Sequence, residues 1–432
     1  MSNSKQTIVT LFGFSFLSAA SYVVTSALGI SLFISRVGSY SLPVVLVASA
    51  LTVILVSFAT RWLIARISPR LCVVMSWLIM GASSLLISLS LVKDHHSFFL
   101  LASLYVLGEV RGSLNSVYVT TFTNDSFASS STKRPYVVVA MGGPIAGIVA
   151  GSLMSLGSTE IQGTTWIAIV AALDLATLAL TRWLPRPSSF GRTPSSKSLL
   201  KLASAKVVVR ERMQAVHRRP IGHAAYRYRY ALAALVGVKV AVLALVGYQW
   251  KVVAGDYFVD EQRLLAYFAT FYAVSDVLIL LLQLSTATKL LDRFGIGLPL
   301  HAYPLLLAVL GVTALATGTP AMMIVVFTLG RGLNVLRRSF HDPGLASAYS
   351  ILDPKIRRET IVVVKGMIKP FAEAVAALGL LFFSSELSAS QLTFIWLVML
   401  VPWFWFAHWV AETYDRVGTP RVGVPIEELD PS

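Results

Sequence analysis

The chain has 432 residues, of which 56% are hydrophobic and only 13% are charged, and its net charge is +15. Soluble proteins usually carry about 25% charged residues, which cover their surface, so we expect lipid to cover this one. The single cysteine, Cys72, lies inside an apolar run, which excludes an internal disulfide framework.

Twelve apolar runs follow one another along the chain, and a helix needs about 20 apolar residues to cross a bilayer. We expect spans at 9–35, 41–60, 71–91, 97–122, 136–157, 163–183, 230–255, 264–286, 298–317, 320–338, 360–385 and 390–412. The first run is too long for a cleavable signal peptide and has no clear small-residue cleavage site. The sequence therefore predicts an all-α integral membrane protein with twelve transmembrane helices.

The longest stretch between these runs divides six spans from six. We predict an N-terminal six-helix half at 1–183, a basic cytoplasmic linker at 184–229, a C-terminal half at 230–412 and a cytoplasmic tail at 413–432. The linker segment 196–219 is either an amphipathic helix on the inner membrane surface or a solvated connection. Six spans, a linker and six spans is the plan of the major facilitator fold, with two pseudo-symmetric halves.

Two weaker signals support a repeat. The loop KLLDRFG (289–295) resembles the facilitator loop pattern, and RWLIARIS (61–68) is a degenerate copy with Ala65 in place of the aspartate. The predicted spans 4 and 10 both contain an arginine followed by glycine, leucine and asparagine, at Arg111 and Arg331. The two arginines are 220 residues apart, about half of the chain.

Basic residues alternate between the predicted loops and so set an orientation. With a cytoplasmic N-terminus, the outer loops hold only Arg36, Lys93 and Arg263, and the segment from Arg182 to Arg229 alone adds twelve basic residues on the inner side. We expect an inner (cell) membrane protein with both termini cytoplasmic. Because the positive charge follows every second loop, it indicates topology, and we expect no nucleic-acid partner.

Ten charged residues fall within the predicted spans, and a charge near the bilayer midplane costs at least about 2.5 kcal/mol. The bases are Arg111, Lys239, Lys251, Arg331, Lys365 and Lys369, and the acids are Glu109, Asp174, Asp276 and Glu373. Such groups are tolerated around a water-filled passage or in mutual pairs that lock helices together. The excess of two cations favours a passage for an anionic solute.

Arg111 and Arg331 are the strongest candidates for substrate binding, because a guanidinium can hold phosphate or carboxylate oxygens in two places. We expect Lys239 and Lys365 to assist them. The other candidates each have a structural alternative to substrate binding. Lys369 and Glu373 are four residues apart on one helix face and can neutralise each other. Lys251 can extend its ammonium group to the membrane surface, and Tyr248 can be a packed aromatic residue instead of a surface on which a base stacks. Asn115 and Asn334, which follow the two arginines, complete the expected substrate-binding set.

The four acids are candidates for coupling or charge pairing. Glu109 and Asp276 would bind a proton or hold the arginines in place, Asp174 would pack helices together, and Glu109 points to a different side of its helix from Arg111. No histidine pair within a span has metal-ligand spacing, and there is no phosphate-binding loop or nucleophile elbow. We therefore expect no metal, no cofactor and no enzyme activity.

Several stretches resemble the ATP/ADP translocases, a nucleotide transporter family, and their bacterial relatives. These are YVLGEVRGSLNSVYVTTFTND (105–125), KRPYVVVAMGGPIAGIVAG (133–151), YQWK (248–251), FYAVSDVLILLLQL (271–284) with LDRFGIG (291–297), and RRSFHDPGLASAYSILDPKIR (337–357). They touch six of the twelve spans. The resemblance implies the facilitator-like fold and nucleotide exchange, with the family's functional acids at Glu109 and Asp276.

The chain also departs from that family. The family's lysine in span 11 aligns near Ile361, acidic positions of bacterial relatives fall on Lys365 and Lys369, and Val110 and Arg111 replace a tryptophan. These changes add positive charge and favour a different anion. We therefore expect a monomeric secondary transporter of an anionic solute, surrounded by membrane lipid and working by alternating access. The alternatives are an exporter of lipophilic compounds by proton antiport and a non-transporting accessory or sensor protein.

Overall fold

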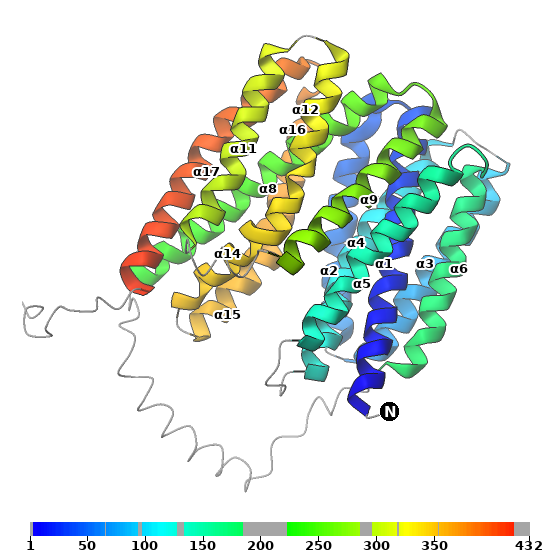
Figure 1. Cartoon of the computed structure of the whole chain (residues 1–432), viewed down its shortest axis with the longest axis horizontal. Coiled ribbons are helices and arrows are strands. Elements are labelled where there is room, and N and C mark those ends of the chain that lie inside the picture. The colour runs from blue at the N-terminus through cyan, green and yellow to red at the C-terminus, as the bar shows by residue number, and fades with distance from the viewer. Residues whose placement is uncertain are drawn as a thin grey trace, which may run out of the picture.

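The computed structural model describes residues 3–64, 66–93, 97–127, 134–184, 223–285, 296–317, 319–352 and 354–418, and all its long elements there are helices (Figure 1). The linker helix expected within 196–219 and the loop at 289–295 lie outside these ranges. Large apolar side chains such as Leu55, Phe58 and Trp405 are exposed. A surface of this kind needs lipid, so the chain is a multi-pass membrane protein.

Every predicted span coincides with a helical segment. The first six are α1 (Asn3–Arg36), α2 (Leu42–Ile64), α3 (Pro69–Leu91), α4 (Phe98–Phe127), α5 (Arg134–Gly157) and α6 (Gly163–Leu180). The later ones are α8 (His223–Tyr257), α9 (Glu261–Ser285), α11 (Gly297–Ala316), α12 (Pro320–Gly332), α15 (Pro354–Val363) with α16 (Lys369–Phe383), and α17 (Ala389–Gly418). Two of them extend well past the expected limits, since α8 begins at His223 and α17 ends at Gly418.

Judged by length and composition, nine helices in the described ranges are able to cross a membrane. The other three spans are α4, which carries Glu109 and Arg111, the short α12, and the interrupted pair α15 and α16. In α4 the charged and polar residues lower the hydropathy, whereas breaks in the helix leave α12, α15 and α16 with only 13, 10 and 15 residues.

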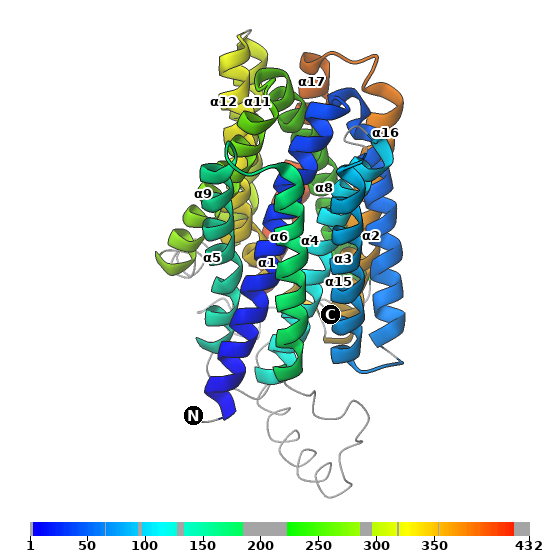
Figure 2. The ribbon, with the colours of Figure 1, turned by 90° about the vertical axis from the view of Figure 1, so that its right-hand side faces the viewer.

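The two halves repeat one packing pattern. In the first half α1 packs against α4, α5 and α6, and α3 packs against α6. In the second half α8 packs in the same order against α12, α16 and α17, and α11 packs against α17. The two halves contact each other where α5 packs against α9 and where α2 packs against α16 (Figures 1 and 2). The pseudo-symmetry that relates the two halves places α5 on α16 and α2 on α9, so it converts one of these contacts into the other.

The central helices are the most enclosed. In the most apolar 18-residue segment of α1, 89% is buried inside the protein, compared with 22% of the corresponding segment of α2. Small residues on α4 allow α1 to approach closely, because a Cβ added at Gly112 would lie 2.7 Å from Cε2 of Tyr22. A continuous cluster of buried apolar side chains runs through both halves, so both contribute to one core.

Two π-helical turns occur in the described part of the chain: η3 (Arg337–His341) begins at the end of the predicted span 10 and continues past it, and η5 (Val364–Ile368) lies within span 11. Each turn is followed, after one residue, by a proline, at Pro343 and Pro370. A proline has no amide hydrogen to donate, and its ring clashes with the carbonyl four residues earlier. That carbonyl lies within the π-helical turn in both cases, so widening the turn relieves the clash. The short helix α14 (Asp342–Ala348) follows η3.

Candidate functional site

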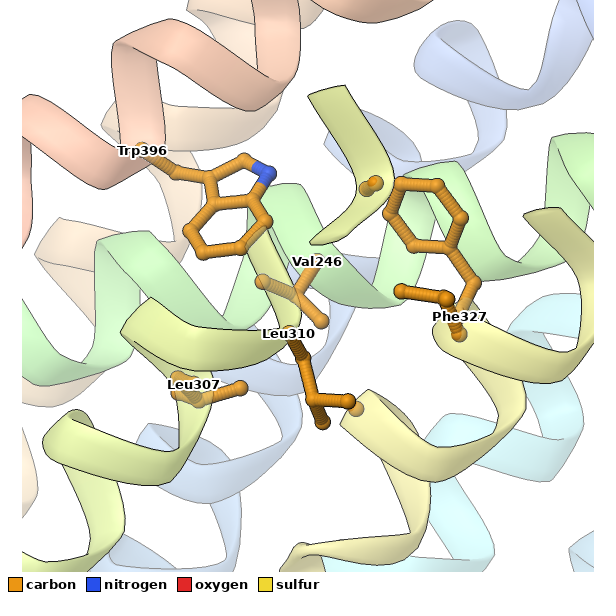
Figure 3. A pocket seen from close by; sticks show the side chains of 8 residues that line it. Val246, Leu307, Leu310, Phe327 and Trp396 are labelled. Atoms are coloured by element: carbon orange, nitrogen blue, oxygen red, sulfur yellow. The ribbon is translucent and has the colours of Figure 1, made fainter. Parts of the chain in front are cut away.

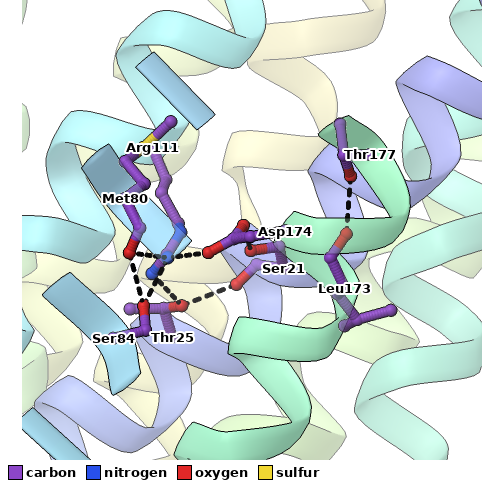
Figure 4. Close-up of polar contacts among 8 residues, drawn as sticks. All are labelled: Ser21, Thr25, Met80, Ser84, Arg111, Leu173, Asp174 and Thr177. Carbon is purple, nitrogen blue, oxygen red and sulfur yellow. Dashed lines mark hydrogen bonds and ion pairs between the residues drawn. The ribbon is translucent and has the colours of Figure 1, made fainter. Parts of the chain in front are cut away.

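A buried ion pair fastens four helices of the N-terminal half together (Figure 4). Arg111 on α4 is 2% exposed and forms an ion pair with Asp174 on α6. Its Nη1 donates to Oγ1 of Thr25 on α1 at 2.8 Å, and its Nη2 donates to Oγ of Ser84 on α3 at 2.6 Å. Ser21 donates to the other oxygen of Asp174 at 2.6 Å.

This arrangement corrects the role expected for Arg111. Its guanidinium is enclosed inside one half and is neutralised by Asp174, so in this structure it does not offer a free fork to a solute. Asp174 takes the helix-packing role that the sequence left open. The near-equivalent arginine of the second half, Arg331, is placed differently.

Glu109 lies two residues before Arg111, about 200° around the helix, and its side chain is exposed. It lies within electrostatic range of Tyr22 on α1, Tyr272 on α9 and Lys251 on α8. Glu109 therefore faces the second half. The expectation that Glu109 and Arg111 point to different sides is confirmed by their surroundings.

Lys251 reaches from the second half into the first. Its ammonium donates to the hydroxyl of Tyr105 on α4 and lies 4.9 Å from the centroid of that ring. The side chain is buried, and no carboxylate of the described residues lies within 4.0 Å of it. Lys251 thus does not snorkel to the membrane surface, and its charge remains available.

Arg331 is half-buried near the end of α12, with its guanidinium 5.5 Å from the ring centroid of Trp250. It lies within electrostatic range of Lys251, Tyr105 and Tyr272. Among the described residues it also has no carboxylate within 4.0 Å.

These groups form what we call the central charge cluster, which consists of Glu109, Lys251, Arg331, Tyr22, Tyr105 and Tyr272. Both halves contribute to it, through α1 and α4 on one side and α8, α9 and α12 on the other. Two cations against one carboxylate leave an excess positive charge. Three phenol groups add hydrogen-bond donors and ring faces.

The tyrosines were not predicted from the sequence. Tyr105 stands four residues before Glu109 and so shares its helix face, which is a usable signal. Nothing in the local sequence distinguishes Tyr22 or Tyr272 from packed aromatic residues.

The sequence YQWK (248–251) makes four contacts in four directions, because successive helical residues point about 100° apart. Tyr248 is hydrogen-bonded to Ser384, within the second half. Gln249 accepts from Nε1 of Trp396 at 2.6 Å and donates to Thr393 at 3.0 Å, both on α17. Trp250 donates to the hydroxyl of Tyr267 on α9 at 2.6 Å. Only Lys251 joins the cluster, so Tyr248 is a packed aromatic here and not a stacking surface.

The remaining expected charges are paired outside the cluster. Lys239 contacts Asp342 at 3.0 Å, Asp276 contacts Arg338 at 3.8 Å, and Lys369 contacts Glu373 at 3.8 Å. The pairing of Lys369 with Glu373 is the structural alternative that their spacing allowed. Asp276 also lies directly against Gly147 of α5.

Three expected residues stay apart from the cluster or lack a described side chain. Asn115 accepts from Ser18 at 2.7 Å, which joins α4 to α1. Oδ1 of Asn334 is buried without a hydrogen-bond partner. Lys365 lies in η5, and its side chain is not among those described.

An apolar recess lies within the second half, between α8, α11, α12 and α17 (Figure 3). Its lining includes Val246, Leu310, Phe327 and Trp396 and no charged residue. No member of the central charge cluster lines it. In the described ranges, no group of three or more His, Cys, Asp or Glu side chains is placed to hold a metal ion.

No model of a protein family matches the sequence, and no curated protein matches it. Solved structures do match across nearly the whole chain. The nucleoside transporter NupG superposes with a TM-score of 0.62 at 14% identity, over 96% of this chain and 99% of that one. A POT family transporter in complex with 5-aminolevulinic acid gives 0.65 at 12% identity, over 95% and 96%. The peptide transporter POT in complex with sulfate gives 0.64 at 14% identity, over 96% and 95%.

These likenesses establish the fold. The chain has the twelve-helix, two-half architecture of the membrane transporters on which it superposes. The resemblance to the ATP/ADP translocases is supported only to this coarser level, that of the shared transporter fold.

Proposed function

We propose that the protein is a secondary transporter that moves a small anionic solute by alternating access, with the solute bound at the central charge cluster. The observation that carries this is the pair Lys251 and Arg331, two cations at the contact between the halves with no described carboxylate within 4.0 Å. A charge inside a membrane protein needs a counter-charge or water. A carboxylate or phosphate group of a solute supplies the counter-charge.

Glu109 and the tyrosines define the rest of such a solute. Glu109 faces the two cations and suits a proton or an amino group of the solute as its partner. The faces of Tyr22, Tyr105 and Tyr272 suit a flat ring, which keeps a nucleotide-like solute within the proposal. The sequence has no phosphate-binding loop, so we propose that an ion or solute gradient drives transport.

The test is ligand binding to the purified protein, followed by uptake into proteoliposomes. Thermal stability would be measured with a nucleoside monophosphate, a sugar phosphate and a dicarboxylate, since a ligand of the folded state raises Tm. We expect one of these to raise Tm and to be transported, and Arg331→Gln and Lys251→Gln to abolish both effects. Arg416→Gln is the matched control, because this arginine is 74% exposed on its side chain and pairs with Glu412 at 2.5 Å, away from the cluster.

The result that contradicts the proposal is full binding and uptake in both cluster variants. If no anion binds or moves while the protein is folded, the accessory or sensor function becomes the better account.

One observation favours the rival function, export of lipophilic compounds, namely the apolar recess beside α12. Filling it with Gly330→Leu distinguishes the two. An exporter of lipophilic compounds would lose binding in that variant, whereas an anion transporter would lose it only in the Arg331 and Lys251 variants.

A further inference from the structure

Lys239 is a deeply buried cation that depends on one carboxylate. Its side chain is 7% exposed on α8, and its Nζ lies 3.0 Å from Oδ1 of Asp342. No other described carboxylate lies within 4.0 Å of it. The two partners differ in access, because the side chain of Asp342 is 42% exposed. The anion of this pair can therefore leave toward solvent, whereas the cation cannot.

Asp342 is also shared between more than one cation. Arg337 lies within electrostatic range of Asp342, and its Nε is buried with no hydrogen-bond partner. Lys369 on α16 lies within range of Lys239. Asp342 thus faces Lys239 and the half-buried Arg337, while Lys369 pairs with Glu373 at 3.8 Å, and Glu373 also lies within electrostatic range of Arg337. Three cations against two carboxylates leave this part of the second half with a positive excess even when Asp342 is in place.

The backbone that carries Asp342 departs from regular α-helical winding next to an anchored residue. The ring of His341 contacts the carbonyl of Pro299 at 3.3 Å and packs against Tyr303. Asp342 directly follows the π-helical turn η3, and Pro343 cannot donate an amide hydrogen bond behind it. Within the turn, Oγ of Ser339 and Nε2 of His341 are buried without partners. A π-helical turn often marks a place where a helix changes its winding, so Asp342 lies on a segment that can reposition.

We propose that Asp342 is a resident counter-anion, which neutralises Lys239 until the carboxylate or phosphate group of a solute takes its place. This inference rests on the proposed transport of an anion and adds a second binding position, nearer the inner end of α8 than the central charge cluster. Since a buried ammonium group is stabilised by a negative partner, an anion is the kind of ligand that replaces Asp342 without leaving Lys239 charged and unpaired. The exchange thereby makes entry to this position selective for negative charge.

The test is anion rescue. Asp342→Asn keeps the shape of the side chain but removes its charge, so Lys239 loses its partner. We expect the Tm of Asp342→Asn to fall in chloride buffer and to rise more than that of the unmodified protein when phosphate or succinate is added at matched ionic strength. The two anions separate recognition of phosphate from recognition of carboxylate. Asp342→Glu should behave as the unmodified protein.

Two further variants make the test specific. The double variant Lys239→Gln/Asp342→Asn removes both charges, so it should recover Tm relative to Asp342→Asn and lose the anion rescue. Glu412→Gln makes the same change of net charge at an exposed pair on α17 that contains none of these cations, and it should show no rescue. Equal rescue in Glu412→Gln, or a Tm of Asp342→Asn that neither falls nor responds to anions, would overturn the inference.

Anion rescue also separates this inference from the proposed function. If Arg331→Gln and Lys251→Gln leave solute binding unchanged while Asp342→Asn is rescued by an anion, the central site fails and the position at Lys239 stands. If instead Arg331→Gln and Lys251→Gln lose solute binding while Asp342→Asn shows no anion rescue, the proposed position at Lys239 is wrong and the central site stands.

Discussion

Single residues decide how this chain tolerates charge inside a membrane. Arg111 and Arg331 occupy matching motifs in the two halves, yet Arg111 is neutralised by Asp174, whereas Arg331 has no described carboxylate within 4.0 Å. The sequence predicted the depth of both, because depth follows from position along a helix. Which way a side chain points around its helix depends on the neighbouring helices, so their different roles could not be predicted.

Breaking the Arg111–Asp174 pair should strongly destabilise the fold. Removing one partner of a buried ion pair costs about 3–5 kcal/mol, because the other charge stays buried and uncompensated. We therefore expect Asp174→Asn to lower the unfolding temperature strongly, and Arg111→Met/Asp174→Leu to recover part of the loss.

The control is Glu412→Gln in the exposed pair with Arg416, where the expected loss is about 0–1 kcal/mol. Thermal unfolding in detergent measures all three variants. Equal losses at the two pairs would show that Arg111 is not held as the structure places it.

At the scale of elements, the apolar runs predicted where the helices lie, because a helix needs about 20 apolar residues to cross a bilayer. Nine of the described helices meet that requirement by length and composition, and α4, α12 and the pair α15 and α16 do not. The breaks in spans 10 and 11 were not predicted, although Pro343 and Pro370 were visible signals. A proline inside an apolar run shows that a helix is strained there, but whether it kinks, ends or widens depends on packing. The residues of η3 and α14 were consequently expected in a loop, and Asp342 was overlooked.

The contact of α5 with α9 depends on two glycines, Gly147 and Gly151, since a Cβ added at Gly151 would lie 2.6 Å from the carbonyl oxygen of Ala269 on α9. A Cβ added at Gly147 would collide with the carboxylate of Asp276, whereas one added at Gly143, a turn earlier, would meet nothing within 4 Å. We expect Gly147→Ala to push the two helices apart, at about 1–3 kcal/mol, and to impair transport.

Gly143→Ala is the matched control, since it makes the same change on the same helix and should be tolerated. Thermal unfolding and proteoliposome uptake are the measurements. Normal uptake by Gly147→Ala would mean that α5 and α9 do not need this close approach.

For the whole molecule, the two ends of the described chain, the start of α1 and the end of α17, lie at one end of the bundle, and the end of α1 and the start of α9 lie at the other end (Figure 1). Arg36 at the end of α1 makes two hydrogen bonds to Glu261 at the start of α9, at 2.7 and 2.9 Å. Ser155 on α5 and Thr270 on α9 are hydrogen-bonded at 2.8 Å. If the ends lie in the cytoplasm, as the basic loops indicate, this conformation is closed toward the outside.

Locking that closure should stop transport. In a Cys72→Ser background, Ser155→Cys/Thr270→Cys places two thiols where two hydroxyls now touch. We expect oxidation to form a disulfide and to abolish uptake, and reduction to restore it. Each single cysteine variant should be insensitive to oxidation, and continued uptake by the oxidised double variant would contradict alternating access at this contact.

Weakening the closure should have the opposite effect on conformation. Glu261→Gln removes the counter-charge of Arg36, so the outer ends of α1 and α9 should separate more often. In the same Cys72→Ser background, a cysteine at Ser155 should then react faster with a membrane-impermeant thiol reagent added outside. An unchanged reaction rate would show that the Arg36–Glu261 pair does not hold the outer side shut.

The four residues of YQWK limit how α8 is able to move. One turn of this helix is bonded to α4, to α9, to α17 and to the residue after α16. Rolling about its own axis would break all four attachments together, whereas tilting preserves those within the second half and strains only the one made by Lys251. Spin labels on opposite faces of α8 should accordingly shift in the same direction during a transport cycle.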